Sequence, residues 1–191
     1  MPSLHQPALI RNLAALPFAI FAIGCARPDE AAATTAVEQQ PPLATCTVTR
    51  ISDGDSFECR STGRVRLLMI DAPELAQGEE GRLAKAALER LAPRGTVVGI
   101  ETDVRPKDDY ERTLAYAYLP DGRMLNEEMA RAGLVTALVY PPNVKHSARI
   151  RGAVRDAQEK KRGLWATSFF DCEPRDYRAG RCGGGRPRPR R

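Results

Sequence analysis

Residues 46–70 read CTVTRISDGDSFECRSTGRVRLLMI. Three segments of this stretch are rich in β-branched and alternating apolar residues: 46–51, 56–60 and 64–70. Asp53-Gly54 and Thr62-Gly63 separate these segments, and such dipeptides are typical of the tight turns that join neighbouring strands. The stretch therefore predicts three consecutive antiparallel strands.

The residues that follow alternate between helical and extended patterns. In residues 80–91, apolar side chains recur with the period of a helix, which ends before Pro93. Residues 96–104 and 113–119 alternate as strands. We expect two further helices, one that Asn126 caps and that runs to Arg131, and one over residues 147–162. Five short strands with a helix after the third indicate an OB-fold-like five-stranded β-barrel of the α+β class, with about three packed helices, over residues 45–167.

The composition is that of a soluble globular chain, with 191 residues of which 42% are hydrophobic and 28% are charged. Its net charge of +5 is unevenly placed, because residues 172–191 carry +5 and residues 45–171 only +1. The predicted domain is almost neutral. Net charge therefore gives no argument that this domain binds nucleic acid.

Residues 1–24 are typical of a secretory signal peptide. Arg11 precedes an apolar run over residues 13–24, which is shorter than the roughly 18–20 residues that span a bilayer. The run Ala-Ile-Gly-Cys at 22–25 resembles the bacterial lipoprotein signal, in which the cysteine carries lipid, although Leu is usual at its first position. Lipidation of Cys25 with membrane attachment, and plain cleavage near Ala26, both stay open. Either places the protein outside the cytoplasm, in the periplasm, in the cell envelope or secreted.

Cysteine usage agrees with that compartment. If Cys25 is processed, four cysteines remain for two disulfides: Cys46, Cys59, Cys172 and Cys182. Cys46 and Cys59 flank the first turn, which predicts that they pair and leave Cys172 for Cys182. A zinc site is the alternative, but no pair has close ligand spacing.

Two segments are predicted to lie outside the domain. Residues 25–44 are rich in Ala, Thr, Gln and Pro and indicate a flexible tether. Residues 168–191 form a basic tail rich in Arg, Gly and Pro, which we expect to be mobile apart from a loop closed by Cys172 and Cys182. This tail either binds nucleic acid or acidic surfaces or is simply solvated.

Acidic residues gather where the predicted strands end. Asp55 opens the second strand and Asp71 closes the third, so adjacent strands bring both carboxylates to one rim of the sheet. Each acid alone has an ordinary explanation as a turn or cap residue. Together, two hard oxygen donors with a backbone carbonyl and open water positions suit Ca²⁺ better than zinc.

Two arginines lie near strand ends as well. Arg66 is in the third strand and Arg112 precedes a later one. Two guanidinium groups that converge on a metal-bound anion make a phosphate clamp, whereas a surface ion pair is the ordinary reading of each one alone.

An ordered set of motifs resembles the thermonuclease (staphylococcal nuclease-like) family over about residues 46–166. The motifs are DGDS at 53–56, RLLMIDAPE at 66–74, DYERTLAYAY at 109–118, Asn126, Gly-Leu at 133–134 and GLW at 163–165. The resemblance implies an OB-type barrel and a Ca²⁺-dependent phosphodiesterase that cuts DNA and RNA to leave 3′-phosphate ends.

The resemblance also implies roles for single residues. Asp55, Asp71 and the carbonyl of Ala72 match calcium ligands, and Glu74 matches the general base. Arg66 and Arg112 match the phosphate-clamping arginines. Asp53 would support the site from behind, and Tyr110 would contact the terminal phosphate or pack under the nucleotide. We expect a monomer that acts on DNA, RNA or both.

Departures from the family pattern limit which properties of the family can be expected of this chain. Glu111 replaces a glycine, so the loop is expected to avoid a positive φ or to bend differently. Leu138 replaces a base-stacking tyrosine, Asp109 replaces a lysine, and the loop LAQGEEG at 75–81 is short and acidic. We expect altered or weaker substrate binding.

The alternative function is a non-catalytic OB module that binds nucleic acid or a partner protein. The complete set of Asp55, Arg66, Asp71, Glu74 and Arg112 argues against it.

Overall fold

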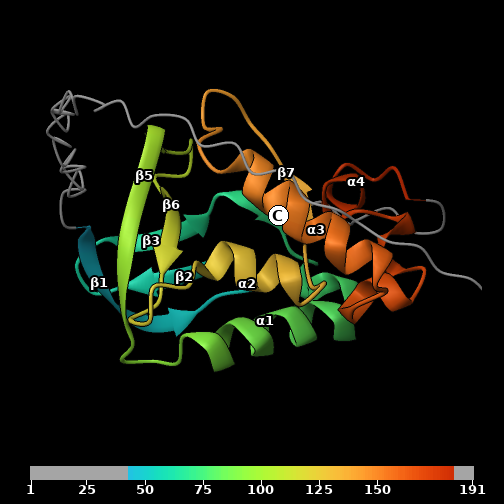
Figure 1. The fold of residues 1–191 in the computed structure, drawn as a ribbon, viewed down its shortest axis with the longest axis horizontal. Coiled ribbons are helices and arrows are strands. Elements are labelled where there is room, and N and C mark those ends of the chain that lie inside the picture. Colours follow the sequence, from blue (N-terminus) through green and yellow to red (C-terminus); the bar gives the residue numbers. More distant parts are fainter. Residues whose placement is uncertain (1–42, 183–191) are drawn as a thin grey trace, which may run out of the picture. The chain divides into compact units, whose positions relative to one another are not determined.

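A computed structural model describes residues 43–182 (Figure 1). The predicted signal peptide, the lipidation of Cys25, all but the last two residues of the predicted tether, and the last nine residues of the chain lie outside this range. Within it, no helix is long and apolar enough to cross a membrane.

Five strands close into a barrel. The strands are β1 (Ala44–Ile51), β2 (Ser56–Cys59), β3 (Gly63–Leu67), β5 (Val97–Lys107) and β6 (Thr113–Tyr118). Their order around the barrel is β1-β2-β3-β6-β5, and all neighbours are antiparallel except β3 and β6. The turns at Asp53-Gly54 and Thr62-Gly63 join β1 to β2 and β2 to β3. The predicted five-stranded OB-like barrel is confirmed.

The third predicted strand is not continuous. It breaks after β3, and Met69, at φ 66°, turns the chain into β4 (Met69–Asp71). β4 pairs with β7 (Thr136–Leu138), a strand that the sequence pattern did not reveal, in a separate two-stranded sheet. The apolar run conceals the break, because residues on both sides of it are buried.

Four α-helices and three short 3₁₀ turns complete the described chain. The helices are α1 (Glu79–Leu91), α2 (Leu125–Arg131), α3 (Ser147–Glu159) and α4 (Pro174–Arg178). The turns are η1 (Leu75–Gln77), η2 (Gly163–Ala166) and η3 (Phe169–Asp171). Three of the helices were predicted, and α2 packs between α1 and α3.

Asn126 does not cap α2, because the helix begins one residue earlier and Asn126 is fully buried. Its side-chain oxygen accepts from the amide of Ala117, and its Nδ2 donates to the carbonyl oxygens of Leu68 and Ala115. These three bonds to the backbone satisfy the buried side-chain amide of Asn126. Asn126 thus fastens α2 to the point where β3 gives way to β4.

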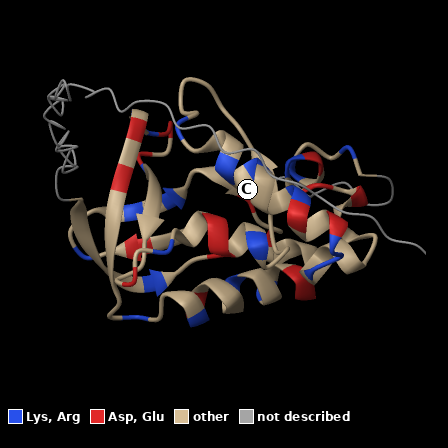
Figure 2. Ribbon diagram, in the orientation of Figure 1, with Lys and Arg blue, Asp and Glu red and all other residues tan. Residues whose placement is uncertain are grey.

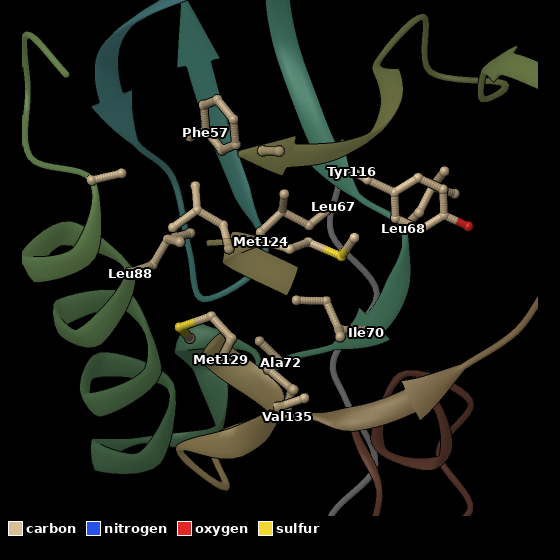
Figure 3. Packing of buried hydrophobic residues seen from close by; sticks show 14 of the residues in the cluster. Phe57, Leu67, Leu68, Ile70, Ala72, Leu88, Tyr116, Met124, Met129 and Val135 are labelled. Carbon is tan, nitrogen blue, oxygen red and sulfur yellow. The ribbon is translucent and has the colours of Figure 1, made fainter. Parts of the chain in front are cut away.

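The main core lies between the barrel and the helices. Phe57, Leu67 and Tyr116 from the barrel belong to one buried cluster with Leu88 from α1 and Met129 from α2 (Figure 3). Ile70 and Ala72 extend this core beneath β4. Because side chains alternate along a strand, Asp71 between them faces the opposite side.

Two disulfides are present in the predicted pairing. Cys46 bonds Cys59 and Cys172 bonds Cys182, each with a Cα–Cα distance of 5.6 Å. The second closes a loop that contains α4, and Phe170 just before it is buried against Trp165, with ring centroids 4.3 Å apart. Residues 168–182 are therefore more structured than their composition predicts.

Candidate active site

One cavity of about 590 Å³ opens beside the barrel. It is lined by residues that follow β1, by β3 and β4, by the turn before β6, by the segment after β7 and by Arg178 of α4. All eight residues predicted for the site line it: Asp53, Asp55, Arg66, Asp71, Ala72, Glu74, Tyr110 and Arg112. The structure thus brings the whole predicted set together.

Asp55 and Asp71 face each other across Arg66. The Nε of Arg66 lies 3.1 Å from Asp55 Oδ1, and its Nη2 lies 3.1 Å from Asp71 Oδ1. The other oxygen of Asp55 accepts from the amide of Ala72 at 2.7 Å. Asp55 therefore connects the start of β2 to the end of β4, and both carboxylates are buried.

Gly54 allows this approach of the two segments. A Cβ atom there would lie 2.6 Å from the Cβ of Ala84 in α1 and 2.7 Å from the Cβ of Ala72. Asp53, on its other side, accepts from the amide of Asp55 at 3.0 Å. The turn DGD is thus packed against α1 and against the residue that follows Asp71.

The side chains that line the cavity carry more negative than positive charge. Burial, and then the charge of Asp55, raises the pKa of Asp53 to about 6. Burial also raises the pKa of Asp71, although Arg178 and Arg66 oppose that rise. Six carboxylates and four arginines line the cavity, which leaves two negative charges. Along the ribbon, Lys and Arg are interspersed with Asp and Glu (Figure 2).

A divalent cation fits this donor set. Within residues 43–182, no three His, Cys, Asp or Glu side chains are grouped as metal ligands. A cation would therefore rest on two carboxylates, a backbone carbonyl and water, which are the hard oxygen donors that Ca²⁺ accepts.

Glu74 is held by the turn that follows β4. Its amide donates to Gln77 Oε1 at 2.9 Å, and its carbonyl accepts from the amide of Gln77 at 2.8 Å. A Cβ atom at Gly81 would lie 2.2 Å from the carbonyl oxygen of Glu74. The first turn of α1 therefore packs directly against the backbone of Glu74, and the short acidic loop serves to place this side chain.

Arg112 is positioned by Asp108. The Nε of Arg112 donates to Asp108 Oδ2 at 2.7 Å, and Asp108 Oδ1 accepts from the amides of Tyr110 and Arg112. Burial and these bonds act in opposite directions on the pKa of Asp108, and the bonds prevail and lower it. The guanidinium carbon of Arg112 lies 5.6 Å from the centre of the Tyr110 ring, which is itself largely exposed.

Glu111 has a left-handed backbone conformation, which glycine would adopt more readily at this position. Its φ is 59°, so the expectation that the loop avoids a positive φ is wrong. Its side chain pairs with Lys107 at 2.8 Å and is not among the residues that line the cavity. The Glu111 carboxylate is therefore paired with a lysine and lies outside the cavity lining.

The sequence of residues 64–167 matches the family described as staphylococcal nuclease homologue. The chain belongs to the staphylococcal nuclease family. It is similar to the thermonuclease of Staphylococcus intermedius, at 36% identity over 62% of this chain and 74% of the relative. The thermonuclease of Staphylococcus hyicus is 34% identical over the same shares. An uncharacterized endonuclease of Haemophilus influenzae is 36% identical over 70% of this chain and 72% of the relative.

Several cavity residues of this staphylococcal nuclease homologue were not predicted as site residues: Arg105, Tyr140, Asn143 and Arg178. Arg105 pairs with Asp109, and Asn143 bonds the backbone of Arg105, with Oδ1 at 2.7 Å and Nδ2 at 2.8 Å. Tyr140, exposed before two prolines, had a sequence signal as an aromatic residue in a loop. Leu138 also lines the cavity.

Arg178 had no such signal, since it lies in an arginine-rich tail beyond the family match. Its Nη1 donates to Glu74 Oε1 at 2.8 Å and its Nη2 to Asp71 Oδ2 at 2.9 Å. Arg66 and Arg178 therefore occupy both oxygens of Asp71.

Proposed function

We propose that the chain hydrolyses phosphodiester bonds in DNA, RNA or both, with Ca²⁺ held by Asp55, Asp71 and the carbonyl of Ala72. The enzyme class, a hydrolase and nuclease, follows from family membership. The finer proposal rests on one observation. Two buried carboxylates that share Arg66 line a cavity with an excess of two negative charges, and Glu74 lies in the same cavity.

Each residue has a proposed part in the reaction. Glu74 accepts the proton of a water molecule that attacks phosphorus in line with the leaving oxygen. Arg112, with Arg66, donates hydrogen bonds to phosphate oxygens as their negative charge grows. A bound Ca²⁺ would supply a Lewis acid that polarises the phosphoryl oxygen. Asp53 supports Asp55, and Tyr110 contacts the nucleotide at the mouth of the cavity.

We propose the remaining assignments on the sequence and the disulfides. The chain comprises a signal peptide at 1–24, a tether at 25–44, the nuclease domain at 45–167 and a basic tail at 168–191. The two disulfides support a location outside the cytoplasm. Lipid attachment at Cys25 and plain signal cleavage stay as alternatives, and we expect a monomer.

The test is hydrolysis of single-stranded DNA, duplex DNA and RNA by the oxidised protein, with Ca²⁺ and then with a chelator. We expect cleavage that the chelator abolishes and added Ca²⁺ restores, because the carboxylate site needs a divalent cation to balance its charge. Restoration by another divalent cation and not by Ca²⁺ would reject the calcium assignment. No cleavage by folded, Ca²⁺-loaded protein would favour the binding module instead.

A further inference from the structure

Arg178 reaches the candidate active site from outside the family domain. It is the last residue of α4, inside the loop that Cys172–Cys182 closes, whereas the family match ends at residue 167. Its side chain nevertheless lines the same cavity as Glu74 and Asp71. Family membership therefore assigns this residue no role.

The guanidinium of Arg178 bridges two of the proposed active-site acids. One terminal nitrogen binds Glu74 at 2.8 Å and the other binds Asp71 at 2.9 Å. The bond from Arg178 occupies one carboxylate oxygen of Glu74, Oε1. The bridge thus fixes the direction of Glu74 relative to Asp71.

Arg178 keeps more donors for a ligand than Arg66 does. Arg66 donates to the carbonyl oxygens of Leu67 and Ile70 and to Asp71, and its Nε faces Asp55. A guanidinium has five N–H groups, and Arg178 uses two of them on residues 43–182. Since 41% of its side chain is exposed, its remaining donors can reach a phosphate in the cavity.

The loop that carries Arg178 is anchored on both sides of it. The hydroxyl of Tyr177 donates to the carbonyl oxygen of Ala76 in η1 at 3.3 Å. Phe170 packs on Trp165 ahead of the loop, and the disulfide closes the loop behind α4. A guanidinium placed in advance stabilises developing charge without a cost of reorganisation during the reaction.

The charge of the cavity is compatible with Arg178 and a divalent cation together. With Arg178 in place the lining carries two excess negative charges, which one divalent cation balances. Displacement of the arginine by the cation is therefore not required for neutrality.

We propose that Arg178 is a catalytic residue, which binds the scissile phosphate and holds Glu74 in the direction of attack. This inference rests on the proposed nuclease function. The C-terminal disulfide loop is accordingly a wall of the active site that lies beyond the residues matched to the family.

The test compares Arg178→Gln with Arg175→Gln. Arg175 lies in the same short helix, pairs with Glu173 at 3.0 Å and does not line the cavity, so it is a charge-matched control. We expect Arg178→Gln to lower kcat about 10²-fold, as loss of one oxyanion donor does, and Arg175→Gln to leave kcat unchanged. Arg178→Lys should restore part of the loss, because it returns the charge without the planar fork. An unchanged or faster Arg178→Gln enzyme would overturn the proposal.

Two further measurements separate catalysis from structure. Removal of a neighbouring positive charge should leave Ca²⁺ affinity equal or higher in Arg178→Gln, whereas weaker Ca²⁺ binding would show a structural role and refute the proposal. The double variant Cys172→Ser/Cys182→Ser should lose activity as well. Adding Arg178→Gln to it should then cause little further loss, because both changes remove the same interaction. If the losses of activity caused by the two changes were fully additive, the loop would not act through Arg178.

Binding of a short single-stranded DNA, measured in a Glu74→Gln background, distinguishes this inference from the proposed function. We expect Arg178→Gln to weaken binding there and Arg175→Gln not to. If the wild-type protein does not cleave nucleic acid but DNA binding still depends on Arg178, the proposed function is rejected and the phosphate contact stands. If the wild type cleaves and Arg178→Gln binds and cleaves equally well, the inference fails and the function stands.

Discussion

At the scale of single residues, the site depends on side chains whose orientation is fixed by hydrogen bonds to neighbouring residues. Glu74 is the clearest case, since its backbone is bonded to Gln77 and one carboxylate oxygen is bonded to Arg178. The sequence motif predicted which residue stands here. The motif could not predict the bond to Arg178. Residues 168–191 are rich in glycine, proline and arginine, and this composition does not show which of the arginines contacts the site.

Replacing Glu74 by Gln should lower kcat by roughly 10²- to 10⁴-fold while substrate binding is largely kept, because the amide cannot accept the proton of the attacking water. Steady-state kinetics and oligonucleotide binding would measure the two effects. Glu89→Gln, on the exposed face of α1, is the charge-matched control. Equal losses in both variants would exclude a specific role for Glu74.

At the scale of elements, prediction succeeded where periodicity was regular and failed where the chain changed direction. The helices α1 and α3 were predicted close to their observed bounds, because their apolar faces repeat with the helical period. The break at Met69 and the strand β7 were missed, because a buried apolar run looks the same whether it continues or turns. That break determines where Asp71 and Ala72 lie.

Gly81→Ala tests the contact between α1 and Glu74. Alanine normally stabilises a helix interior relative to glycine by about 1 kcal/mol, but here its Cβ would meet the carbonyl of Glu74. We expect a loss of about 1–3 kcal/mol in the free energy of unfolding, together with a lower kcat as Glu74 shifts. Urea unfolding and kinetics would measure both.

Gly152→Ala in α3 is the control, since nothing lies within 4 Å of a Cβ atom there and the change should stabilise the protein. Stabilisation of the protein by Gly81→Ala as well would contradict the proposed contact.

At the scale of the whole molecule, the set of sequence motifs was sufficient to predict the barrel and the eight site residues that were expected from the sequence. The order in which the strands close the barrel and the docking of residues 168–182 became known only from the structure.

A polar cluster lies outside the cavity. In it, Glu101 of β5 joins Tyr118 of β6 to Lys145 and His146 before α3. Tyr118 Oη lies 2.6 Å and His146 Nε2 lies 2.9 Å from Glu101 Oε2.

Burial would raise the pKa of Glu101, but Lys145, Tyr118 and His146 together lower it to about 2. A carboxyl with a lowered pKa in the folded state stabilises that state above its ordinary pKa, and the stabilisation is lost as pH falls through about 4.5 toward 2. We expect Glu101→Gln to lower the free energy of unfolding at pH 7 by on the order of 2 kcal/mol and to flatten its dependence on pH in that window. Denaturant unfolding between pH 3 and 7 would test this, with exposed Glu159→Gln as the control. An unchanged pH dependence would show that the cluster does not stabilise the fold.

The break at Met69 assigns the two candidate metal carboxylates to different hydrogen-bonded sheets. Asp55 immediately precedes the barrel strand β2, whereas Asp71 ends β4, which pairs only with β7 among the described strands. A cation shared by these carboxylates would act as a removable cross-link between the sheets. Because such a cation would bind the folded state and not the unfolded one, the calcium concentration around the protein would set the stability of the folded domain as well as its turnover.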